Sequence, residues 1–401
     1  MTIYLLDQAD IHTQLLPLTY TRPISDLRVG ILTIKEKWQH LTKATTVSIT
    51  TSYLQKETLP NDGQSNWVVN GSLCPSPELI ESIQSLGENQ KLMKEGQFLA
   101  AKASVLPVFD QENFSTYPSL EFEGEATLIE RPYHIFGHNG DQIRNDYKIL
   151  TEGRKSVEIT DPHTVIYGAE NIFLEEGSSV KACILNAENG PIYIGKNAQV
   201  QEGAIIKGPF ALCEGSHVNI GAKVRGDSTI GPHSKIGGEV SNSVILGFSN
   251  KAHDGYLGNS VIGEWCNLGA DTNTSNLKNN YDEVKIWDYA QKSFRKTGLQ
   301  FCGLIMGDHS KCGINTMFNT GTVVGVSANI YGSGFPRNFV PSFSWGGSSG
   351  FTSYQLKKAI KTAQIVFSRK NIEWSDNDAS LFEAIFEKTA AYRIWDKKSE
   401  S

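Results

Sequence analysis

Apolar residues recur at every sixth position along the second half of the chain, usually directly before a glycine. The clearest register is Met306-Gly307, Cys312-Gly313, Phe318-Asn319, Val324-Gly325 and Ile330-Tyr331. Neither the α-helical period nor the alternation of a single strand gives this spacing, whereas hexapeptide β-helices do. In such a coil the apolar residue points inward and the glycine helps the chain turn a corner, where positive φ is often needed. The pattern predicts a parallel β-helix from about residue 165 to residue 343, with about eight coils.

The six-residue period disappears between residues 272 and 302. This segment is polar, basic and aromatic, so the sequence predicts a loop that leaves the β-helix. Loops on rigid scaffolds often carry function. The alternative is an insertion that a solenoid surface merely tolerates.

The first 150 residues follow another pattern, in which short apolar runs alternate with helical periodicity. Strands are predicted at 3–6, 45–51, 67–69 and 98–105, and helices at 29–40, 77–86 and 141–150. This alternation predicts an α/β domain with a mostly parallel sheet. Residues 353–369 and 378–395 predict amphipathic helices that cap the open end of the β-helix. The expected domains are therefore 1–150, 151–347 and 348–401.

Charge and composition narrow the classes of partner. The formal net charge of −6 argues against a general nucleic-acid binder, and no apolar run approaches the ~20 residues of a membrane span. The N-terminal MTIYLLDQAD lacks the basic residues and long apolar stretch of a signal peptide. The six cysteines contain no C-x-x-C pair. We therefore expect a cytoplasmic protein with reduced thiols.

Three short stretches in and after the β-helix pattern carry a family resemblance. They are NKAHDGYLG at 250–258, IGEWCNLGA at 262–270 and TSN at 274–276. They resemble the acetyltransferase motif of the bifunctional UDP-N-acetylglucosamine pyrophosphorylase/glucosamine-1-phosphate N-acetyltransferase family. That family joins an N-terminal nucleotidyltransferase to a left-handed β-helix. The resemblance implies a left-handed coil, acetyl-CoA as cofactor, and a homotrimer that binds CoA between adjacent prisms.

The same resemblance implies roles for five residues. His253 is the expected catalytic base, since an amine must lose a proton to attack a thioester and an imidazole can take one near neutral pH. Lys251, Tyr256, Asn267 and Asn276 are the expected substrate-binding residues, with Asn276 reaching the substrate from the loop. The alternative is that His253 is an ordinary corner residue of the coil.

The chain departs from the family where two basic residues should hold the sugar phosphate. Leu212-Cys213-Glu214 and Ser241 stand at those positions. Arg225 or Lys207 from neighbouring coils are candidates to replace them; otherwise the acceptor is another amino sugar or a sugar nucleotide. The basic and aromatic stretch 285–296 predicts contacts with CoA phosphates, a cover over a neighbouring subunit, or a solvated loop.

The N-terminal domain carries a weaker resemblance. LPLTYTRP at 16–23 resembles the L-x-P-L-T-x-x-x-P segment of sugar-phosphate nucleotidyltransferases, which cradle phosphates on a glycine-rich loop. Here DQADIH at 7–12 occupies the position of that loop, and Asn70-Gly71-Ser72 replaces the metal-binding G-D segment. Thr19, Arg22 and Arg28 are candidate nucleotide contacts, with ordinary turn residues as the alternative. The resemblance implies Mg²⁺ for this domain, although these residues offer no clear site.

The stretch 133–146 holds two histidines and two acids, a composition that also occurs in metal sites. His134 and His138 have helical i, i+4 spacing, but Gly137 and Gly140 disfavour a helix there. The sequence therefore predicts a structural linker rather than a metal centre.

Three functions are compatible with these patterns. The leading hypothesis is an acetyl-CoA-dependent N-acetyltransferase that acts on an amino-sugar phosphate, similar to glucosamine 1-phosphate, in sugar-nucleotide biosynthesis. Its N-terminal domain would add a sugar-1-phosphate nucleotidyltransferase activity. The second hypothesis is a nucleotidyltransferase whose β-helix only forms the trimer. The third is a non-enzymatic binding or scaffold protein, which a fold alone does not exclude.

Overall fold

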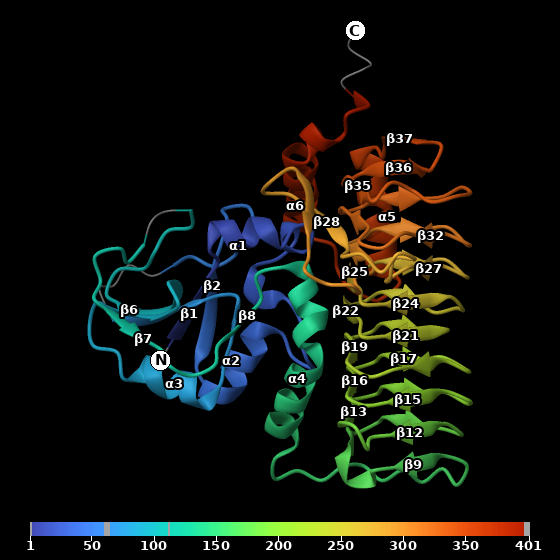
Figure 1. Ribbon diagram of the computed structural model, residues 1–401, viewed down its shortest axis with the longest axis horizontal. Helices are drawn as coiled ribbons and strands as arrows, with labels where there is room; N and C mark the ends of the chain where they lie inside the picture. Colours follow the sequence, from blue (N-terminus) through green and yellow to red (C-terminus); the bar gives the residue numbers. More distant parts are fainter. Residues whose placement is uncertain (1, 60–64, 111–112, 397–401) are drawn as a thin grey trace. The chain divides into compact units, whose positions relative to one another are not determined.

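The computed structural model describes residues 2–59, 65–110 and 113–396, drawn as coloured ribbons in Figure 1. Packing divides the chain into two units. The N-terminal unit contains Met1–Leu15, Thr21–Arg28 and Leu32–Arg131, and the β-helix unit contains Leu16–Tyr20, Val29–Ile31 and Pro132–Ser401. The domain boundaries after residues 150 and 347 stay predictions. No helix of the described ranges combines the length and apolarity of a membrane span.

The N-terminal unit is built on a sheet of six strands in the order β2-β1-β3-β6-β5-β7. Its strands are β1 (Thr2–Leu6), β2 (Thr45–Ile49), β3 (Asn66–Asn70), β5 (Gln90–Lys94), β6 (Gln97–Ala103) and β7 (Ser119–Glu121); β4 (Leu73–Cys74) pairs separately with β8 (Thr127–Leu128). Strands β2, β1 and β3 run parallel, but β6 runs antiparallel to both of its neighbours. The reason is the turn at Glu95 and Gly96, whose φ values of 50° and 80° close a tight hairpin between β5 and β6. Since β5 also pairs in parallel with β7, β6 is the one reversed strand of this six-stranded sheet, and the predicted mostly parallel sheet is confirmed.

The helices of this unit are α1 (Ala9–Gln14), α2 (Ile34–Thr42) and α3 (Pro77–Gln84). Helix α2 begins five residues later than the predicted 29–40, because a capping box fixes its first turn. The Thr33 hydroxyl accepts from the Glu36 backbone N–H, and the Glu36 carboxylate accepts from the Thr33 N–H.

The β-helix unit stacks short strands in three ladders, which we call faces 1, 2 and 3. Face 1 contains β10 (Ile172–Leu174), β13 (Ile192–Ile194), β16 (Phe210–Leu212), β19 (Ser228–Ile230), β22 (Val244–Gly247), β25 (Val261–Glu264), β30 (Ile305–Met306), β33 (Val323–Val324) and β35 (Phe339–Val340). Face 2 contains β11 (Ser179–Val180), β14 (Gln199–Val200), β17 (His217–Val218), β20 (Lys235–Ile236), β23 (Asn250–Lys251), β26 (Asn267–Leu268), β31 (Lys311–Cys312), β34 (Asn329–Ile330) and β36 (Ser344–Gly347), with β37 (Gly350–Ser353) antiparallel at its end. Face 3 contains β9 (Val165–Tyr167), β12 (Ile184–Asn186), β15 (Ile205–Lys207), β18 (Lys223–Val224), β21 (Glu239–Ser241) and β24 (Tyr256–Gly258), followed by the pair β27 (Asn273–Thr274) and β32 (Met317–Phe318).

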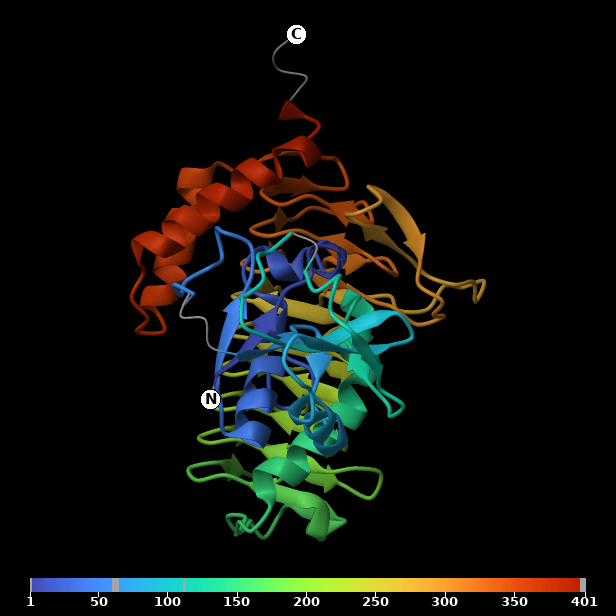
Figure 2. The same cartoon turned by 90° about the vertical axis from the view of Figure 1, so that its left-hand side faces the viewer.

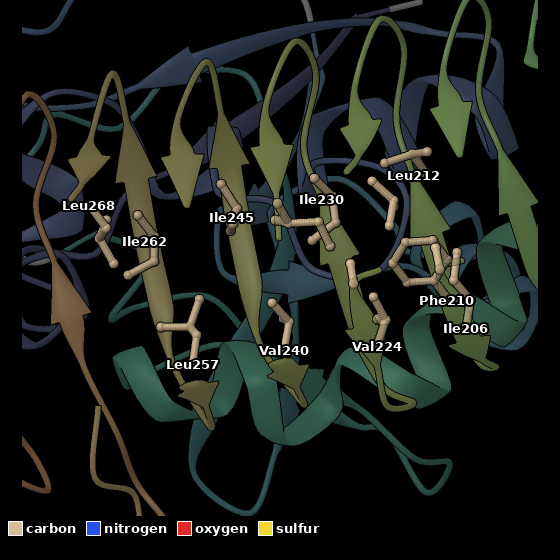
Figure 3. Packing of buried hydrophobic residues seen from close by; sticks show 14 of the residues in the cluster. Ile206, Phe210, Leu212, Val224, Ile230, Val240, Ile245, Leu257, Ile262 and Leu268 are labelled. Atoms are coloured by element: carbon tan, nitrogen blue, oxygen red, sulfur yellow. The ribbon is translucent and has the colours of Figure 1, made fainter. Parts of the chain in front are cut away.

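These ladders confirm the predicted parallel β-helix, and the left-handed sense remains an implication of the resemblance. The solenoid has about ten coils, more than the predicted eight. The sequence pattern did not reveal the early coils, because an apolar residue such as Val180 or Val200 is followed there by a polar residue instead of glycine. Figure 3 shows the apolar side chains of successive coils, among them Ile230, Ile245 and Ile262, turned into the prism interior.

The glycines after the apolar residues have another role than the predicted one. Gly231 and Gly307 do not have positive φ. A Cβ on Gly231 would lie 2.0 Å from the Leu246 carbonyl oxygen, and one on Gly307 would lie 2.9 Å from the Gly325 carbonyl carbon. These positions therefore need glycine because the next coil passes too closely. Positive φ falls two residues later, at His233 and His309.

Helix α4 (Pro132–Thr151) runs through the stretch that was predicted to be an irregular linker followed by a shorter helix. It lies beside the coils of the β-helix in Figure 3. Gly140 is explained by close packing, since a Cβ there would lie 2.0 Å from Asp227 Oδ1. Next to it, Asn139 Nδ2 donates to the Asp227 carbonyl and to Thr229 Oγ1. Packing against the prism thus outweighs the low helix propensity of glycine.

Helices α5 (Leu356–Ser368) and α6 (Asp376–Lys388) lie along the corner between faces 1 and 2, and Figure 2 shows them in red beside the upper coils. Phe367 of α5 stacks on Trp265 with ring centroids 4.3 Å apart, and Phe382 of α6 meets His309 at 4.9 Å. Beyond α5, the Lys370 ammonium donates to the His233 carbonyl at 3.2 Å. The predicted end cap is therefore corrected to a cover along one edge of the prism.

The predicted loop 272–302 leaves the prism later than expected, because β27 still pairs with β32 of the next coil. Thr272 and Thr274 are buried within this coil. After it, β28 (Lys285–Asp288) and β29 (Ser293–Lys296) form an antiparallel hairpin. The excursion is therefore an ordered element.

Candidate functional site

His253 lies at the corner between faces 2 and 3, in the turn that joins β23 to β24. Its side chain is exposed and lines a hollow of about 650 Å³. The hollow is also lined by Asp254 of the same turn and by Asp271 of the next coil. The structure thus places the predicted base in a concave, solvent-accessible site.

Lys251 holds the turn that carries His253. Its side chain is buried, and its ammonium donates to the carbonyls of Gly237 (3.2 Å), Asp254 (2.9 Å) and His253 itself. Burial lowers the pKa of Lys251 to about 8, although Asp254 and Asp271 favour the charged form. The ammonium points into the coil, so the structure gives it a positioning role where a direct substrate contact was expected.

Tyr256 and Asn276 meet on face 3, as their motif spacing predicts. Asn276 Nδ2 donates to Tyr256 Oη at 3.0 Å and to Asn259 Oδ1 at 2.8 Å. Burial raises the pKa of the Tyr256 phenol, so the group stays protonated near neutral pH and keeps a proton to donate. This network ties the start of the loop to the coil that carries His253.

Asn267 and Arg225 lie on different faces. Asn267 is exposed on face 2, where its neighbours in register are Asn250 and Lys311. Arg225 follows β18 on face 3, and its Nη2 lies 3.0 Å from Glu239 Oε1. Glu239 pairs in register with Tyr256, so this ion pair borders the Tyr256–Asn276 network. Lys207, the other replacement candidate, is exposed on face 3.

Two further titratable residues among those that line the His253 hollow were not predicted. His217 and Lys235 occupy outward positions of β17 and β20 and pair in register. Burial, then Lys235 and Lys370, lowers the pKa of the His217 imidazole. The sequence signal for both residues is that they occupy the same position in successive repeats. This signal can be recognised only once the register of the coils is known.

The basic and aromatic stretch 285–296 forms the β28–β29 hairpin, which packs on the chain's own coils. Trp287 stacks on Phe339 with ring centroids 4.2 Å apart, and Ile286 and Tyr289 are buried. The prediction of a merely solvated loop is therefore wrong. Lys285 remains exposed on the hairpin.

The N-terminal unit has its own hollow, of about 490 Å³, at the end of β1. Asp7, Asp10 and Asp110 line it, where the family's glycine-rich loop would lie. Asp7 is buried, and its carboxylate accepts from the Ile24 N–H at 3.0 Å and the Thr50 hydroxyl at 2.6 Å. Burial raises the pKa of Asp7 to about 8. The Asp7 side chain, which directly follows β1, therefore holds neighbouring segments of the fold in place.

The three candidate nucleotide contacts are divided between the two units. Thr19 is buried and belongs to the β-helix unit, whereas Arg22 and Arg28 are buried in the N-terminal unit. Arg28 Nη1 lies 3.5 Å from a Glu36 carboxylate oxygen.

Mg²⁺ does not fit the residues at its expected position. Asn70 donates its amide to the Phe98 carbonyl and accepts from Ser72, so its side chain serves the local backbone. Across the described ranges no three His, Cys, Asp or Glu side chains group as metal ligands.

Comparison with known proteins finds similarity for parts of the chain. Residues 3–155 match a family model described as sugar nucleotidyl transferase. Bifunctional protein GlmU of Methanocaldococcus jannaschii is 40% identical over 87 residues, which are 22% of this chain and 21% of that protein. The bifunctional sugar-1-phosphate nucleotidylyltransferase/acetyltransferase of Sulfurisphaera tokodaii is 33% identical over 144 residues, 35% of each chain. A solved structure of the polySia-specific acetyltransferase NeuO covers 51% of this chain and 89% of its own at 17% identity, with a TM-score of 0.25 that supports no conclusion.

These comparisons confirm the predicted resemblance to the bifunctional nucleotidyltransferase/acetyltransferase family. The matched segments span 21% and 35% of the two relatives' lengths. The similarity therefore extends to parts of those proteins only.

Proposed function

We propose that the β-helix unit transfers an acetyl group from acetyl-CoA to the amine of an amino-sugar phosphate, with His253 as the general base. The relatives that match this chain include a protein named as a nucleotidylyltransferase/acetyltransferase. The arrangement around His253 supports the same chemistry. Sugar-nucleotide biosynthesis in the cytoplasm is the process in which such a product would be used.

The observation that best supports this proposal is that His253 combines an exposed imidazole with a backbone held in place by a hydrogen bond. The His253 side chain is exposed in its hollow, while buried Lys251 binds the His253 carbonyl. A base held in this way can meet an acceptor in a constant orientation, and such positioning supplies much of the rate of a two-substrate reaction.

The reaction needs two proton transfers, one from the attacking amine and one to the departing thiolate. Acetyl-CoA, when bound, supplies a thioester carbonyl that an amine can attack. The His253 imidazole takes a proton from the attacking amine, and the imidazolium then returns it to the departing thiolate. Tyr256 and Asn276 bind the acceptor hydroxyls, since their side chains already form one network beside His253.

For the acceptor we propose a sugar that carries a phosphate, as in glucosamine 1-phosphate. Lys207, Lys223 and Arg225 are exposed on neighbouring strands of face 3 and stand in for the family's missing basic residues. Glu239 already pairs with Arg225, so Lys207 and Lys223 are the more available cations.

We also propose a homotrimer. Ile220, Ile314 and Tyr331 lie at the corner between faces 2 and 3 with exposures of 73%, 71% and 47%. Helix α4 contacts face 1 and helices α5 and α6 cover the corner between faces 1 and 2, so neither covers this apolar edge, which other copies could bury. Light scattering of the full chain tests the mass, and a monomer would contradict the proposal.

A nucleotidyltransferase step is the second candidate function, favoured by the family-model match over residues 3–155. The carboxylates of Asp10 and Asp110 oppose it, since they line the place where a triphosphate would bind. Release of pyrophosphate from a nucleoside triphosphate and a sugar 1-phosphate is the direct assay.

The acetyltransferase proposal is tested with His253→Ala. Acetyl transfer to glucosamine 1-phosphate should fall roughly 10²- to 10⁴-fold in kcat, the usual contribution of a general base. His163→Ala, which removes an exposed imidazole outside the hollow, serves as the control and should retain activity. Equal rates for His253→Ala and the unmodified protein would sink the proposal.

A further inference from the structure

A second hollow of the β-helix unit lies away from His253, between the β28–β29 hairpin and the last coils. We call it the hairpin cavity. Its volume is about 1050 Å³, within the size of sites that enclose organic ligands. All of its lining residues belong to the β-helix unit.

The walls of the hairpin cavity are mainly aromatic. Trp287 and Phe294 come from the hairpin, Phe339 and Phe351 from the last coils, and Tyr392 and Trp395 from the C-terminal segment. Flat walls of this kind suit a flat ring, because stacking adds to the burial of apolar surface. The indole Nε1 of Trp287 is buried and has no hydrogen-bond partner within the described part of the chain, so an acceptor on a ligand could satisfy it.

The charges at the cavity are all of one sign. Lys278, Lys285 and Arg337 line it, and its described lining includes no acidic side chain. Lys278 donates to the Glu283 carbonyl at 2.7 Å, whereas Lys285 and Arg337 are exposed and form no ion pair with a described residue. A cavity with aromatic walls and uncommitted cations fits a ring that carries phosphate groups.

The cavity adjoins the proposed acceptor site through the chain itself. Asn276 belongs to the Tyr256 network and Lys278 to the cavity wall. Their Cα atoms are at most about 7.6 Å apart, since two peptide units separate them. A long ligand with its ring in the cavity can therefore extend toward Tyr256 and the strand that follows His253.

We propose that the hairpin cavity binds an adenine nucleotide bearing phosphates, as found at the nucleotide end of acyl-CoA. The identification of the donor rests on the proposed acetyl transfer, but the nucleotide site itself does not. Uridine nucleotides and nucleotide sugars share the chemistry of a ring with phosphates, and the experiment separates these sources.

The test measures binding of adenosine 3′,5′-bisphosphate and of CoA to the full chain by titration calorimetry. Lys285→Ala and Arg337→Ala should each weaken both ligands about tenfold, because each removes a charge-assisted contact to phosphate. Lys361→Ala, which removes an exposed cation of α5 outside the cavity, is the matched control and should leave both affinities unchanged.

A second pair of variants tests the aromatic walls. Phe294→Ala should weaken the same ligands, whereas Phe335→Ala should not, since the two rings are similarly exposed, 45% and 49%, and only Phe294 lines the cavity. Thermal unfolding of each variant shows whether it is folded. Unchanged affinity in all three cavity variants overturns the inference. Tighter binding of UTP than of adenosine 3′,5′-bisphosphate, with the same sensitivity to the variants, overturns the adenine assignment.

Kinetics distinguish this inference from the function on which the donor identity rests. Arg337→Ala should raise the KM for acetyl-CoA about tenfold without lowering kcat, whereas His253→Ala lowers kcat and leaves the affinity for CoA intact. Cavity-dependent nucleotide binding by a protein that transfers no acetyl group would remove the acetyltransferase proposal and keep the site. If instead the cavity variants transfer acetyl groups with an unchanged KM for acetyl-CoA, the acetyltransferase proposal is kept and the cavity is removed as the donor site.

Discussion

The hollow at His253 and the hollow at Asp7 occupy similar places in the two units, each where a strand of a parallel ladder ends. At His253 the fold holds the backbone and leaves the imidazole exposed. At Asp7 the two carboxylate oxygens accept hydrogen bonds from Ile24 and Thr50, so both oxygens already have partners within the fold. The difference shows that a polar residue type is available for chemistry only when its own hydrogen bonds are not already committed.

Each hollow also rests on one buried ionisable group, and the two groups are displaced in opposite directions. Burial raises the pKa of Asp7 from 3.8 to about 8 and lowers that of Lys251 from 10.5 to about 8. The Lys251 ammonium keeps three carbonyl partners near neutral pH, while the Asp7 carboxyl is mostly protonated there. The following substitutions test this difference between the Asp7 hollow and the His253 hollow.

Asp7→Asn should have the largest effect, and on stability. Between pH 3.8 and about 8 the folded protein keeps a proton that the unfolded chain has lost, so the free energy of unfolding falls as pH rises. The slope approaches about 1.4 kcal/mol per pH unit, which makes several kcal/mol over the interval. Asp7→Asn should remove this dependence in urea unfolding series. Asp10→Asn, an exposed change in the same hollow, should keep it; parallel curves for wild type and Asp7→Asn would contradict the prediction.

Lys251→Met should lower the free energy of unfolding of the β-helix unit by about 3 kcal/mol, because three carbonyls lose a donor. Acetyl transfer should fall as well, since the His253 turn is no longer fixed. From pH 8 to 10.5 the unfolded chain keeps the lysine proton longer than the folded protein, so wild-type stability should rise there relative to the variant. Lys196→Met, on the exposed side of an earlier coil, provides the comparison. Similar denaturation midpoints for both variants would show that Lys251 is not a support.

Tyr256→Phe should have the smallest effect, because it removes one partner of Asn276 and leaves the ring in place. We expect the KM for the acceptor to rise about fivefold, equivalent to about 1 kcal/mol, with little change in folding. Tyr281→Phe is the control, since that ring is 65% exposed. A fall in kcat with an unchanged KM would instead place the phenol in the chemical step.

The sequence predicted the solenoid well because its period is local. Every sixth residue from Met306 to Ile330 points inward, in the register that the spacing gave: Met306, Cys312, Phe318, Val324 and Ile330. Helix α4 was mispredicted at Gly137 and Gly140 because the stabilising contacts come from distant residues such as Asp227. The hairpin 285–296 was ambiguous for the same reason, since stacking on Phe339 is not visible in its own sequence.

The candidate site was predictable only as far as the motif reached. The spacing of Tyr256 and Asn276 brought both side chains together, and His253 is exposed as expected. Lys251 was predicted to bind substrate because it is a charged residue in the motif, but it occupies an inward position of its coil and binds three carbonyls. Sequence spacing identifies the motif, but coil register decides which side chains leave the core.

The corner between faces 1 and 2 constrains how this chain can change length. His233, Phe248, Trp265, His309, Ser327 and Phe343 occupy it in successive coils with φ near 50–60°. The C-terminal segment contacts this corner at both ends of the series, at His233 and at Phe343. Loss or gain of one coil in this interval would displace half of those contacts by one strand spacing, about 4.8 Å. The C-terminal segment therefore fixes the number of coils between His233 and Phe343.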